Sequence, residues 1–345
     1  MNTKIVSITE DNIDPSLIKE AGEIIKRGGL VAFPTETVYG LGGDALNADS
    51  SKKIYAAKGR PSDNPLIVHI YRLEDLDYIV KEVPEKAKKI IDAFWPGPLT
   101  LIFEKKNTVP YETTGGLDTV AVRFPIHQVA ASFIEAAGGF VAAPSANLSG
   151  RPSPTLAKYV REDLDGRVDM IIDGGNIPIG LESTIVDVTR DIPMILRPGY
   201  VSKEMLEEVV ERVDIDPTIL DASCKDRPKA PGMRYRHYAP KADMCIVRGE
   251  DKKVIDKIKE LVSDKDNYVI ISVDEHMKDY EGLNTKNIGS ISHPDDIASN
   301  LYRILRECDD EEVTYIASES FDDKGIGAAI MNRLIKAAGH KIINA

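Results

Sequence analysis

Short runs of apolar and β-branched residues recur along residues 1–210 and alternate with longer segments that have a helical pattern. Several of these runs stop at glycine, proline or aspartate, as strands do. A chain that alternates in this way buries its apolar residues most readily as a sheet with helices packed on it, which predicts a mixed α/β fold. The predicted strands are 30–33, 66–70, 99–103, 119–123, 140–143, 170–172, 184–188 and 194–196.

The helical segments carry recognisable start and stop signals. Asp14 and Pro15 open a helix that closes at Gly28, and another helix begins near Pro84 and ends before Pro96. Proline suits the first helical turn and breaks a helix interior, whereas glycine favours the end of a helix. The alternation continues beyond residue 240 and predicts a smaller, Rossmann-like α/β domain, with helices at 252–262, 295–307 and 328–338 and strands at 268–273 and 313–317.

Between these two parts lies the segment CKDRPKAPGMRYRHYAP, residues 224–240. Its prolines and glycine predict an extended, non-helical connector. The cations and aromatic rings at residues 234–238 could hold a nucleotide by charge and stacking, although a tether neutralised by neighbouring acids is an alternative. We therefore predict a first domain at 1–210, a linker at 211–240 and a second domain at 241–345.

Composition limits the class of protein. The 345 residues have a net charge of −12 and a pI near 5.1, so the average surface repels nucleic acid and no stable nucleic-acid binding is expected. The three cysteines are widely spaced and fit a reducing cytoplasm better than a disulfide scaffold or a zinc ribbon. The N-terminus lacks an apolar h-region and no run of 18 uncharged apolar residues occurs, so neither secretion nor membrane spanning is expected.

Two polar motifs accompany the early strands. In FPTETVYGLG the first strand runs into Thr35, Thr37 and Tyr39, at the kind of strand end where open α/β sheets bind ligands. In KGRPSDNPL a proline-stiffened loop carries Lys58 and Arg60 on either side of a glycine, a pair suited to phosphate or carboxylate. A surface turn and a solvated cation pair are the alternative interpretations.

Three further features point to anion binding. Arg123 ends an otherwise apolar strand and needs an anionic partner, which is either a carboxylate of the protein or one of a substrate. The loop APSANLSGRPS, residues 143–153, offers small hydroxyl and amide donors that suit phosphate oxygens, although an ordinary turn explains it equally well. Ser183 and Thr184 open one strand, and Arg197 closes the next.

Other signatures are missing. No GxxxxGK[ST] occurs, and no GxGxxG follows the first strand, so a P-loop or a dinucleotide fingerprint is not supported. Gly325 and Gly327 at the start of the last helix only weakly resemble such a glycine-rich loop, and they are interpreted as a packing feature. No HExxH, GxSxG or paired His/Cys spacing appears, so covalent serine and zinc chemistry have no candidate site. The acidic run from Asp309 is interpreted as a solvated loop.

The motifs PTETVYGLG, KGRPSDNPL, APSANLSG, ESTIVDV and LRPG occur in this order. The array resembles the YrdC-like domain of threonylcarbamoyl-AMP synthases over roughly residues 10–210, and the linker and tail resemble the long, two-domain form of that family. Acylphosphatase and zinc-finger signatures, which mark hydrogenase-maturation carbamoyltransferases with the same domain, are missing. The resemblance implies a YrdC-like open, twisted mixed sheet, with the linker acting as an active-site lid.

The resemblance also implies a reaction. Threonine and bicarbonate form N-carboxythreonine, whose carboxylate attacks the α-phosphorus of ATP and gives threonylcarbamoyl-AMP and pyrophosphate. The enzyme would be a cytoplasmic nucleotidyltransferase that uses Mg²⁺ with ATP. Its adenylate would serve downstream tRNA threonylcarbamoyl-transfer proteins, which make N6-threonylcarbamoyladenosine (t6A) next to the anticodon of ANN-decoding tRNAs.

Individual residues carry over by similarity. Lys58 and Arg60 are the catalytic candidates, Arg123 would take the α-carboxylate of threonine, and no metal ligand or general base is assigned among the side chains. The residues implied to hold ATP are Lys58, Arg60, Asn64, Thr119, Ser145, Ser153, Arg197 and Tyr235. Those implied to hold threonine are Thr37, His69, Arg123, Ala143 and Ser183.

Two other hypotheses stay open. The chain could be an RNA-binding module. Only the basic residues of 225–236 support this hypothesis, and the net charge opposes it. The C-terminal domain could bind a regulatory ligand or a partner, and its sequence names no ligand.

Overall fold

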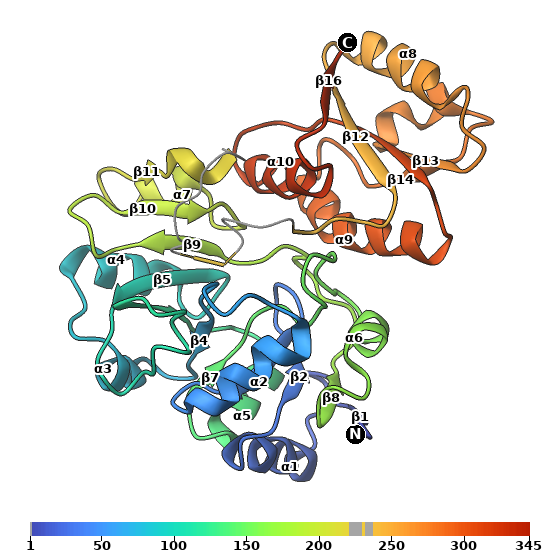
Figure 1. Ribbon diagram of the computed structural model, residues 1–345. Helices are drawn as coiled ribbons and strands as arrows, with labels where there is room; N and C mark the ends of the chain where they lie inside the picture. Colours follow the sequence, from blue (N-terminus) through green and yellow to red (C-terminus); the bar gives the residue numbers. More distant parts are fainter. Residues whose placement is uncertain (1, 221–229, 232–236) are drawn as a thin grey trace. The chain divides into compact units, whose positions relative to one another are not determined.

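The computed structural model describes residues 2–220, 230–231 and 237–345. Within it the chain forms two compact units (Figure 1). The first unit comprises Met1–Ser149, Ser153–Pro178 and Glu182–Arg234, and the second comprises Gly150–Pro152, Ile179–Leu181 and Tyr235–Ala345. The predicted boundaries of the linker stay a prediction, because most of residues 221–236, Tyr235 included, lie outside the described part of the chain.

The first unit is built on a mixed sheet, in agreement with the expected fold class. Both parallel and antiparallel pairs occur in it, and β2 is antiparallel to β3 but parallel to β8. Its eleven strands in the described part of the chain lie in the spatial order β1 (Lys4–Ser7), β8 (Met170–Asp173), β2 (Val31–Phe33), β3 (Gly40–Asp44), β7 (Val141–Ala142), β4 (Ile67–His69), β6 (Thr119–Arg123), β5 (Leu99–Glu104), β9 (Thr184–Asp187), β10 (Met194–Arg197) and β11 (Asp214–Ile215).

Local signals explain the helices of this unit. Asp14 caps the first helix by accepting from the Ser16 backbone N–H, and Gly28 follows the helix with a positive φ of 77°. The helices are α1 (Pro15–Lys26), α2 (Ala48–Lys58), α3 (Leu76–Ile79), α4 (Glu85–Phe94), α5 (Gln128–Ala136), α6 (Ala157–Leu164) and α7 (Lys203–Glu207), with short 3₁₀ turns η1 (Leu73–Asp75) and η2 (Pro217–Leu220).

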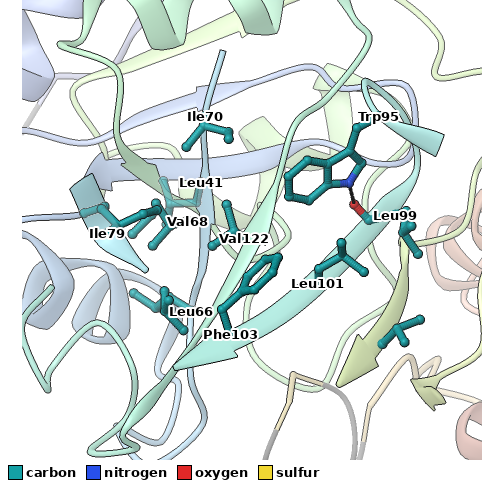
Figure 2. Packing of buried hydrophobic residues seen from close by; sticks show 14 of the residues in the cluster. Leu41, Leu66, Val68, Ile70, Ile79, Trp95, Leu99, Leu101, Phe103 and Val122 are labelled. Atoms are coloured by element: carbon teal, nitrogen blue, oxygen red, sulfur yellow. Dashed lines mark hydrogen bonds between the residues drawn. The ribbon is translucent and has the colours of Figure 1, made fainter. Parts of the chain in front are cut away.

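Strand β6 separates two apolar layers because its side chains alternate in direction. Val120 and Val122 point into the main core, where Figure 2 shows Val122 among Leu101, Phe103 and Trp95. The Trp95 indole N–H donates to the Leu99 carbonyl oxygen at 2.7 Å and so satisfies the polar edge of this buried ring. The opposite face carries a smaller cluster, the apolar floor, formed by Ile67, Ile102, Ala121, Ile185, Leu196 and Ala230.

The second unit is a parallel sheet with crossover helices, as expected for a Rossmann-like domain (Figure 1). Its five described strands lie in the order β14 (Thr285–Asn287), β13 (Tyr268–Ser272), β15 (Tyr315–Glu319), β12 (Asp243–Arg248) and β16 (Ile342–Asn344). The connections are α8 (Asp251–Val262), the 3₁₀ helix η3 (Asp274–Tyr280), α9 (Pro294–Asp310) and α10 (Ile326–Ala337).

Two short segments from earlier in the chain belong to this second unit. The fully buried Arg306 of α9 donates from Nε and Nη2 to the Pro152 carbonyl oxygen, at 3.0 and 2.7 Å. Asp309 accepts from the Lys241 backbone N–H at 2.7 Å and pairs with Arg151 at 3.4 Å. The acidic run therefore starts in the last turn of a helix with a buried carboxylate, and the prediction of a solvated loop was wrong at Asp309.

The eight predicted strands of the first unit are all present, and the helix predictions for both units are confirmed to within a few residues. The glycine-rich segment Gly40–Asp44 is a strand rather than a turn, because it pairs with β2 on one side and β7 on the other. No helix within the described residues is long and apolar enough to cross a membrane.

Candidate functional site

Four strands bring their polar ends to one edge of the first sheet. β4 and β6 run parallel and end side by side, with His69 opposite Arg123. β5 runs the other way and begins at the same edge, where Thr100 lies opposite Arg123. β9 is parallel to β5, and Thr184 lies opposite Leu99. This edge therefore gathers side chains that lie far apart in the sequence.

Arg123 lies at the centre of this edge. Its Nη1 donates to the Thr37 hydroxyl at 2.8 Å, and its Nη2 lies 2.7 Å from Glu36 Oε1, with both charged side chains less than a tenth exposed. The ion pair is close but not aligned as a hydrogen bond: neither carboxylate oxygen accepts one, and Arg123 Nε and Nη2 donate none, among the described residues. The protein thus supplies an anionic partner for Arg123 Nη2 and leaves Nε without an acceptor among the described residues.

Burial next to this cation keeps two histidines neutral. Desolvation, reinforced by the charge of Arg123, lowers the pKa of His69 to about 3, and its Nδ1 lies 3.1 Å from the Ile67 carbonyl oxygen. Burial also lowers the pKa of His127, against the opposing charges of Glu10 and Glu36. A neutral imidazole at His69 adds hydrogen-bonding capacity to the edge without adding a second positive charge.

Ser183 connects this edge to a second arginine. Its hydroxyl lies 2.7 Å from the Thr100 hydroxyl, and Arg197 Nη2 donates to the same Ser183 oxygen at 3.2 Å. Arg197 Nε and Nη2 also donate to the Ser183 carbonyl oxygen, and Nη1 donates to the Pro231 carbonyl oxygen at 3.3 Å. The buried Ala230, next to Pro231, is itself part of the apolar floor, so the described part of the linker packs within this unit.

The structure places Lys58 in the last turn of α2 rather than in a loop, and Gly59, with a positive φ of 61°, ends the helix behind it. The Lys58 side chain is 2 % exposed, and its ammonium group donates to the Ser145 carbonyl oxygen and to the main-chain and side-chain oxygens of Asn147. Lys58 therefore fixes the loop that carries Ser145.

The loop after α2 is held by Arg60, whose Nε and Nη2 donate to the carbonyl oxygens of Asn64 and Pro65 at 3.3 and 3.1 Å. The Asn64 side chain is 1 % exposed, and its Oδ1 accepts no hydrogen bond from any described residue. Because a buried acceptor without a donor is costly, this oxygen is suited to a donor from a ligand.

Ser153 and Glu182 form another buried contact. The Ser153 hydroxyl donates to Glu182 Oε1 at 2.5 Å, and Glu182 directly precedes Ser183. Ser145 donates to Asn147 Oδ1, also at 2.5 Å. The Ser153 hydroxyl is therefore held by the residue before Ser183, and the Ser145 hydroxyl by the loop that Lys58 fixes.

The remaining predicted residues differ in position. The Ala143 backbone N–H donates to the Ile67 carbonyl oxygen at 2.8 Å, next to His69. Thr119 begins β6 and Arg123 ends it on the same face, about 13 Å apart at the usual strand rise. Thr119 can therefore share a ligand with Arg123 only if that ligand extends along the strand. Tyr235 lies outside the described residues.

Sequence reasoning missed Glu36, Thr100 and Glu182 as parts of this site. Strand alternation gives no reason to turn Glu36 inward between two threonines, and only its place in a motif dense in polar groups hinted at a role. Thr100 was the polar residue in an apolar run, but its proximity to Arg123 follows from strand register, which a sequence does not reveal. No group of three or more His, Cys, Asp or Glu side chains that could hold a metal occurs among the described residues.

Comparisons with known proteins agree with this architecture. The Sua5/YciO/YrdC family model, described as "Telomere recombination", matches residues 23–199, and the model described as "Threonylcarbamoyl-AMP synthase, C-terminal domain" matches residues 201–339. Curated proteins named threonylcarbamoyl-AMP synthase are 46% identical in Pyrococcus abyssi, over 99% of both chains, and 44% identical in Bacillus subtilis, over 99% of this chain and 100% of that one.

A solved structure is similar over the same length. The crystal structure of P. abyssi Sua5 complexed with L-threonine is 45% identical, covers 99% of this chain and 100% of its own, and superposes with a TM-score of 0.94. Both family models match in the expected order, and the relatives match from end to end. The chain therefore belongs to the threonylcarbamoyl-AMP synthase family.

Proposed function

We propose that this chain is a nucleotidyltransferase that forms threonylcarbamoyl-AMP and pyrophosphate from L-threonine, bicarbonate and ATP. The carboxylate oxygen of N-carboxythreonine bonds to the α-phosphorus, and the bond from that phosphorus to the pyrophosphate oxygen breaks. The supporting observation is the buried Arg123, which is paired with Glu36 and keeps two donor atoms without a hydrogen bond to described residues. The relatives named for this product support the same assignment.

The edge around Arg123 suits a small hydroxy amino acid. Its guanidinium would take the α-carboxylate, an anion whose two oxygens match a planar fork of donors. Thr37 and Ser183 offer hydroxyls that can turn toward the substrate, and neutral His69 offers a further partner. The small side chain of Ala143 leaves room beside them. The similar P. abyssi protein was crystallised in complex with L-threonine, which supports the same amino acid here.

The nucleotide would lie beside this edge. Arg197 and Arg60 supply charge for the phosphates, and Ser145 and Ser153 supply hydroxyls. Asn64 Oδ1 is a buried acceptor for an amino or hydroxyl donor of the nucleotide. Thr119 would meet the part of ATP that extends along β6, and Tyr235 would approach from the linker. Catalysis by such a site rests on positioning and charge neutralisation rather than on a covalent intermediate.

Lys58 would act on the substrate through a neighbouring loop. Its ammonium group donates hydrogen bonds to the Ser145–Asn147 loop, so we propose that it is a positioning residue for the phosphate-binding loop. The Mg²⁺ ion would arrive with the triphosphate, whose oxygens and water are its usual ligands. Because the described side chains form no metal cluster, no protein ligand and no step of the reaction is assigned to it.

Measuring pyrophosphate release tests the proposal. We expect release only when ATP, Mg²⁺, threonine and bicarbonate are all present, with threonylcarbamoyl-AMP as the co-product identified by mass spectrometry. Serine, which lacks the methyl group of threonine, replaces threonine in the matched control reaction. Release without threonine, or a rate indifferent to bicarbonate, would contradict the assignment. Transfer of the product to tRNA by downstream proteins and a cytoplasmic location stay predictions.

A further inference from the structure

The second unit contains a cavity that the proposed reaction does not use. Its volume is about 350 Å³, and all residues that line it belong to the second unit. The walls come from the loops that follow β12, β13 and β15 and from the first turns of α8, α9 and α10 (Figure 1). A cavity of this size is at the lower end of the range for small-molecule sites.

The connections of the sheet explain why the cavity forms there. The chain leaves β12 through α8 for β13, which lies beyond β15, and it leaves β15 through α10 for β16, which lies beyond β12. The connections that leave the neighbouring strands β12 and β15 therefore run in opposite directions along the sheet. In open parallel sheets this switch point opens a crevice at the carboxyl ends of the strands, and ligands bind in it.

One end of the cavity offers backbone hydrogen-bond donors. No side chain caps α10, and the backbone N–H groups of Ile326, Gly327 and Ala328 donate to none of the described residues. Gly325, at the helix start, has a φ of 54°, and no described atom lies within 4 Å of the position where its Cβ would be. The exposed Lys324 adds a full positive charge next to these donors. Such a helix start attracts a phosphate or a carboxylate.

A buried carboxylate lies in the wall of the same cavity. Glu319 ends β15 and is 4 % exposed, and it accepts from the Ser272 hydroxyl at 2.9 Å and lies 2.9 Å from His276 Nδ1. Burial opposes protonation of His276, but the hydrogen bond and the charge of Glu319 outweigh it and raise the histidine pKa. Ser272 and His276 therefore hold the Glu319 carboxylate in place in the cavity wall, where its oxygens can accept hydrogen bonds from a ligand.

Besides polar residues that include Asp251, Ser320 and Asp322, the lining has an apolar wall. Val254, Ile297, Phe321 and Ile330 provide a surface against which a flat ring can pack. The cavity therefore combines an anion-binding helix start, a buried acceptor for hydroxyl groups and an apolar wall. These are the three chemistries of a nucleotide: phosphate, ribose and base. A dinucleotide is too large for this volume, whereas a mononucleotide is of the right size.

We propose that this cavity binds a nucleoside monophosphate, with the phosphate at the start of α10, the ribose hydroxyls at Glu319 and the base against the apolar wall. The glycines of this loop then have two roles. Gly327 is a packing residue, as predicted from the sequence, because a Cβ there would lie 2.3 Å from the Asp322 carbonyl oxygen. Gly325 instead keeps the phosphate position open. The proposal is independent of the reaction in the first unit.

Hydrogen exchange on the full chain tests the proposal and locates the ligand at the same time. AMP, GMP, CMP and UMP are titrated one at a time, and we expect at least one to protect amides of residues 320–328. Protection confined to the first unit would overturn the proposal, because it would place the nucleotide at the proposed ATP site alone. Equal protection of 320–328 by inorganic phosphate at the same concentration would overturn the nucleoside part.

Variants and analogues sharpen this test. Lys324→Glu reverses an exposed charge beside the proposed phosphate and should weaken the protection of 320–328 by about tenfold or more. Lys259→Glu, an equally exposed lysine on α8 that does not line the cavity, is the matched control and should change nothing. The 2′,3′-dideoxy form of the best nucleotide should bind about tenfold more weakly, since Glu319 loses its hydroxyl partners. Unchanged affinity in both cases would overturn the proposal.

Discussion

The two sheets present polar groups to their ligand-facing edges by different means. At the edge of the mixed sheet, side chains supply the chemistry: Arg123, Ser183 and Arg197 stand at strand ends and hold one another or nearby carbonyl groups in place. At the carboxyl edge of the parallel sheet, the backbone N–H groups at the start of α10 supply the positive pole, and Glu319 is the one buried charge among the described residues of the lining.

This difference decides how much each site reveals in a sequence. A site whose chemistry comes from side chains requires specific residue types, so the first site is visible in the sequence as five ordered motifs. Backbone chemistry needs only glycine and the correct topology, so the second site appears as Gly325 and Gly327 alone. Removing side chains should therefore damage the first site strongly, while the second should respond mainly to changes of charge or shape.

The largest effect is expected for Arg123→Ala. Removing the guanidinium leaves Glu36 buried without its cation, which should lower the free energy of unfolding by about 3–5 kcal/mol. The KM for threonine should rise roughly a hundredfold, because a charged hydrogen-bond pair to its carboxylate is lost. Steady-state kinetics and urea unfolding measure the two effects.

The double variant Arg123→Ala with Glu36→Gln separates those two causes. A neutral amide needs no cation, so we expect most of the lost unfolding free energy to return while the KM for threonine stays high. Recovery of threonine affinity in the double variant would show that Arg123 acts only as a structural partner of Glu36.

A smaller and more selective effect is expected for Lys58→Met. The thioether keeps the volume of the side chain but cannot donate to the loop oxygens of Ser145 and Asn147, so the loop loses its anchor. We expect the KM for ATP to rise about tenfold to a hundredfold and the KM for threonine to change little. Lys52→Met, an exposed lysine earlier on the same helix, is the control. Equal loss for both substrates would contradict a role confined to the loop.

Arg306→Met asks whether the two units are independent. Arg306 holds the Pro152 carbonyl oxygen, and Pro152 directly precedes Ser153, which bonds to Glu182. Leaving that oxygen unpaired should lower the free energy of unfolding by about 1–3 kcal/mol. The substitution should also raise the KM for ATP several-fold, although Arg306 lies in the second unit. An unchanged KM for ATP in a destabilised variant would show that the contact serves only the packing of the second unit.

The sequence predicted most of the fold because the information involved is local. The strands at 119–123 and 184–188 follow from alternation and end signals, and the first helix follows from its proline and glycine. What escaped prediction depends on pairing at a distance. Glycines at 40–43 joined a strand because two partners flank them. Asp309 turned inward because Arg151 and Lys241 meet it from distant parts of the chain.

The candidate site likewise has features that the sequence predicted and features that it did not. Arg123 was recognised as needing an anion, but the anion of the protein, Glu36, could be named only once strand ends were placed together. Lys58 was assigned to phosphate, and that assignment stays a prediction; its hydrogen bonds to the loop beside it could not be foreseen from the sequence. Residue types were therefore predictable, and the roles that depend on neighbours were not.

A last, pH-dependent effect again contrasts the two units, through His69 and His276. The folded-state pKa of His69 is about 3, below the ordinary value near 6.5, so between these values the unfolded chain binds the extra proton. His69 therefore contributes stability above pH 6.5 that is lost as the pH falls toward 3, with a slope of at most about 1.4 kcal/mol per pH unit.

His276 has a raised pKa, so its contribution to stability is present below pH 6.5 and is lost as the pH rises through the folded-state pKa. Urea unfolding across pH 4–8 should show that His69→Gln reduces the loss of stability below pH 6.5 and that His276→Gln reduces the loss of stability above it. An acid limb that keeps its slope in His69→Gln would assign that loss of stability to another group, with His127 the next candidate because burial lowers its pKa in the same direction.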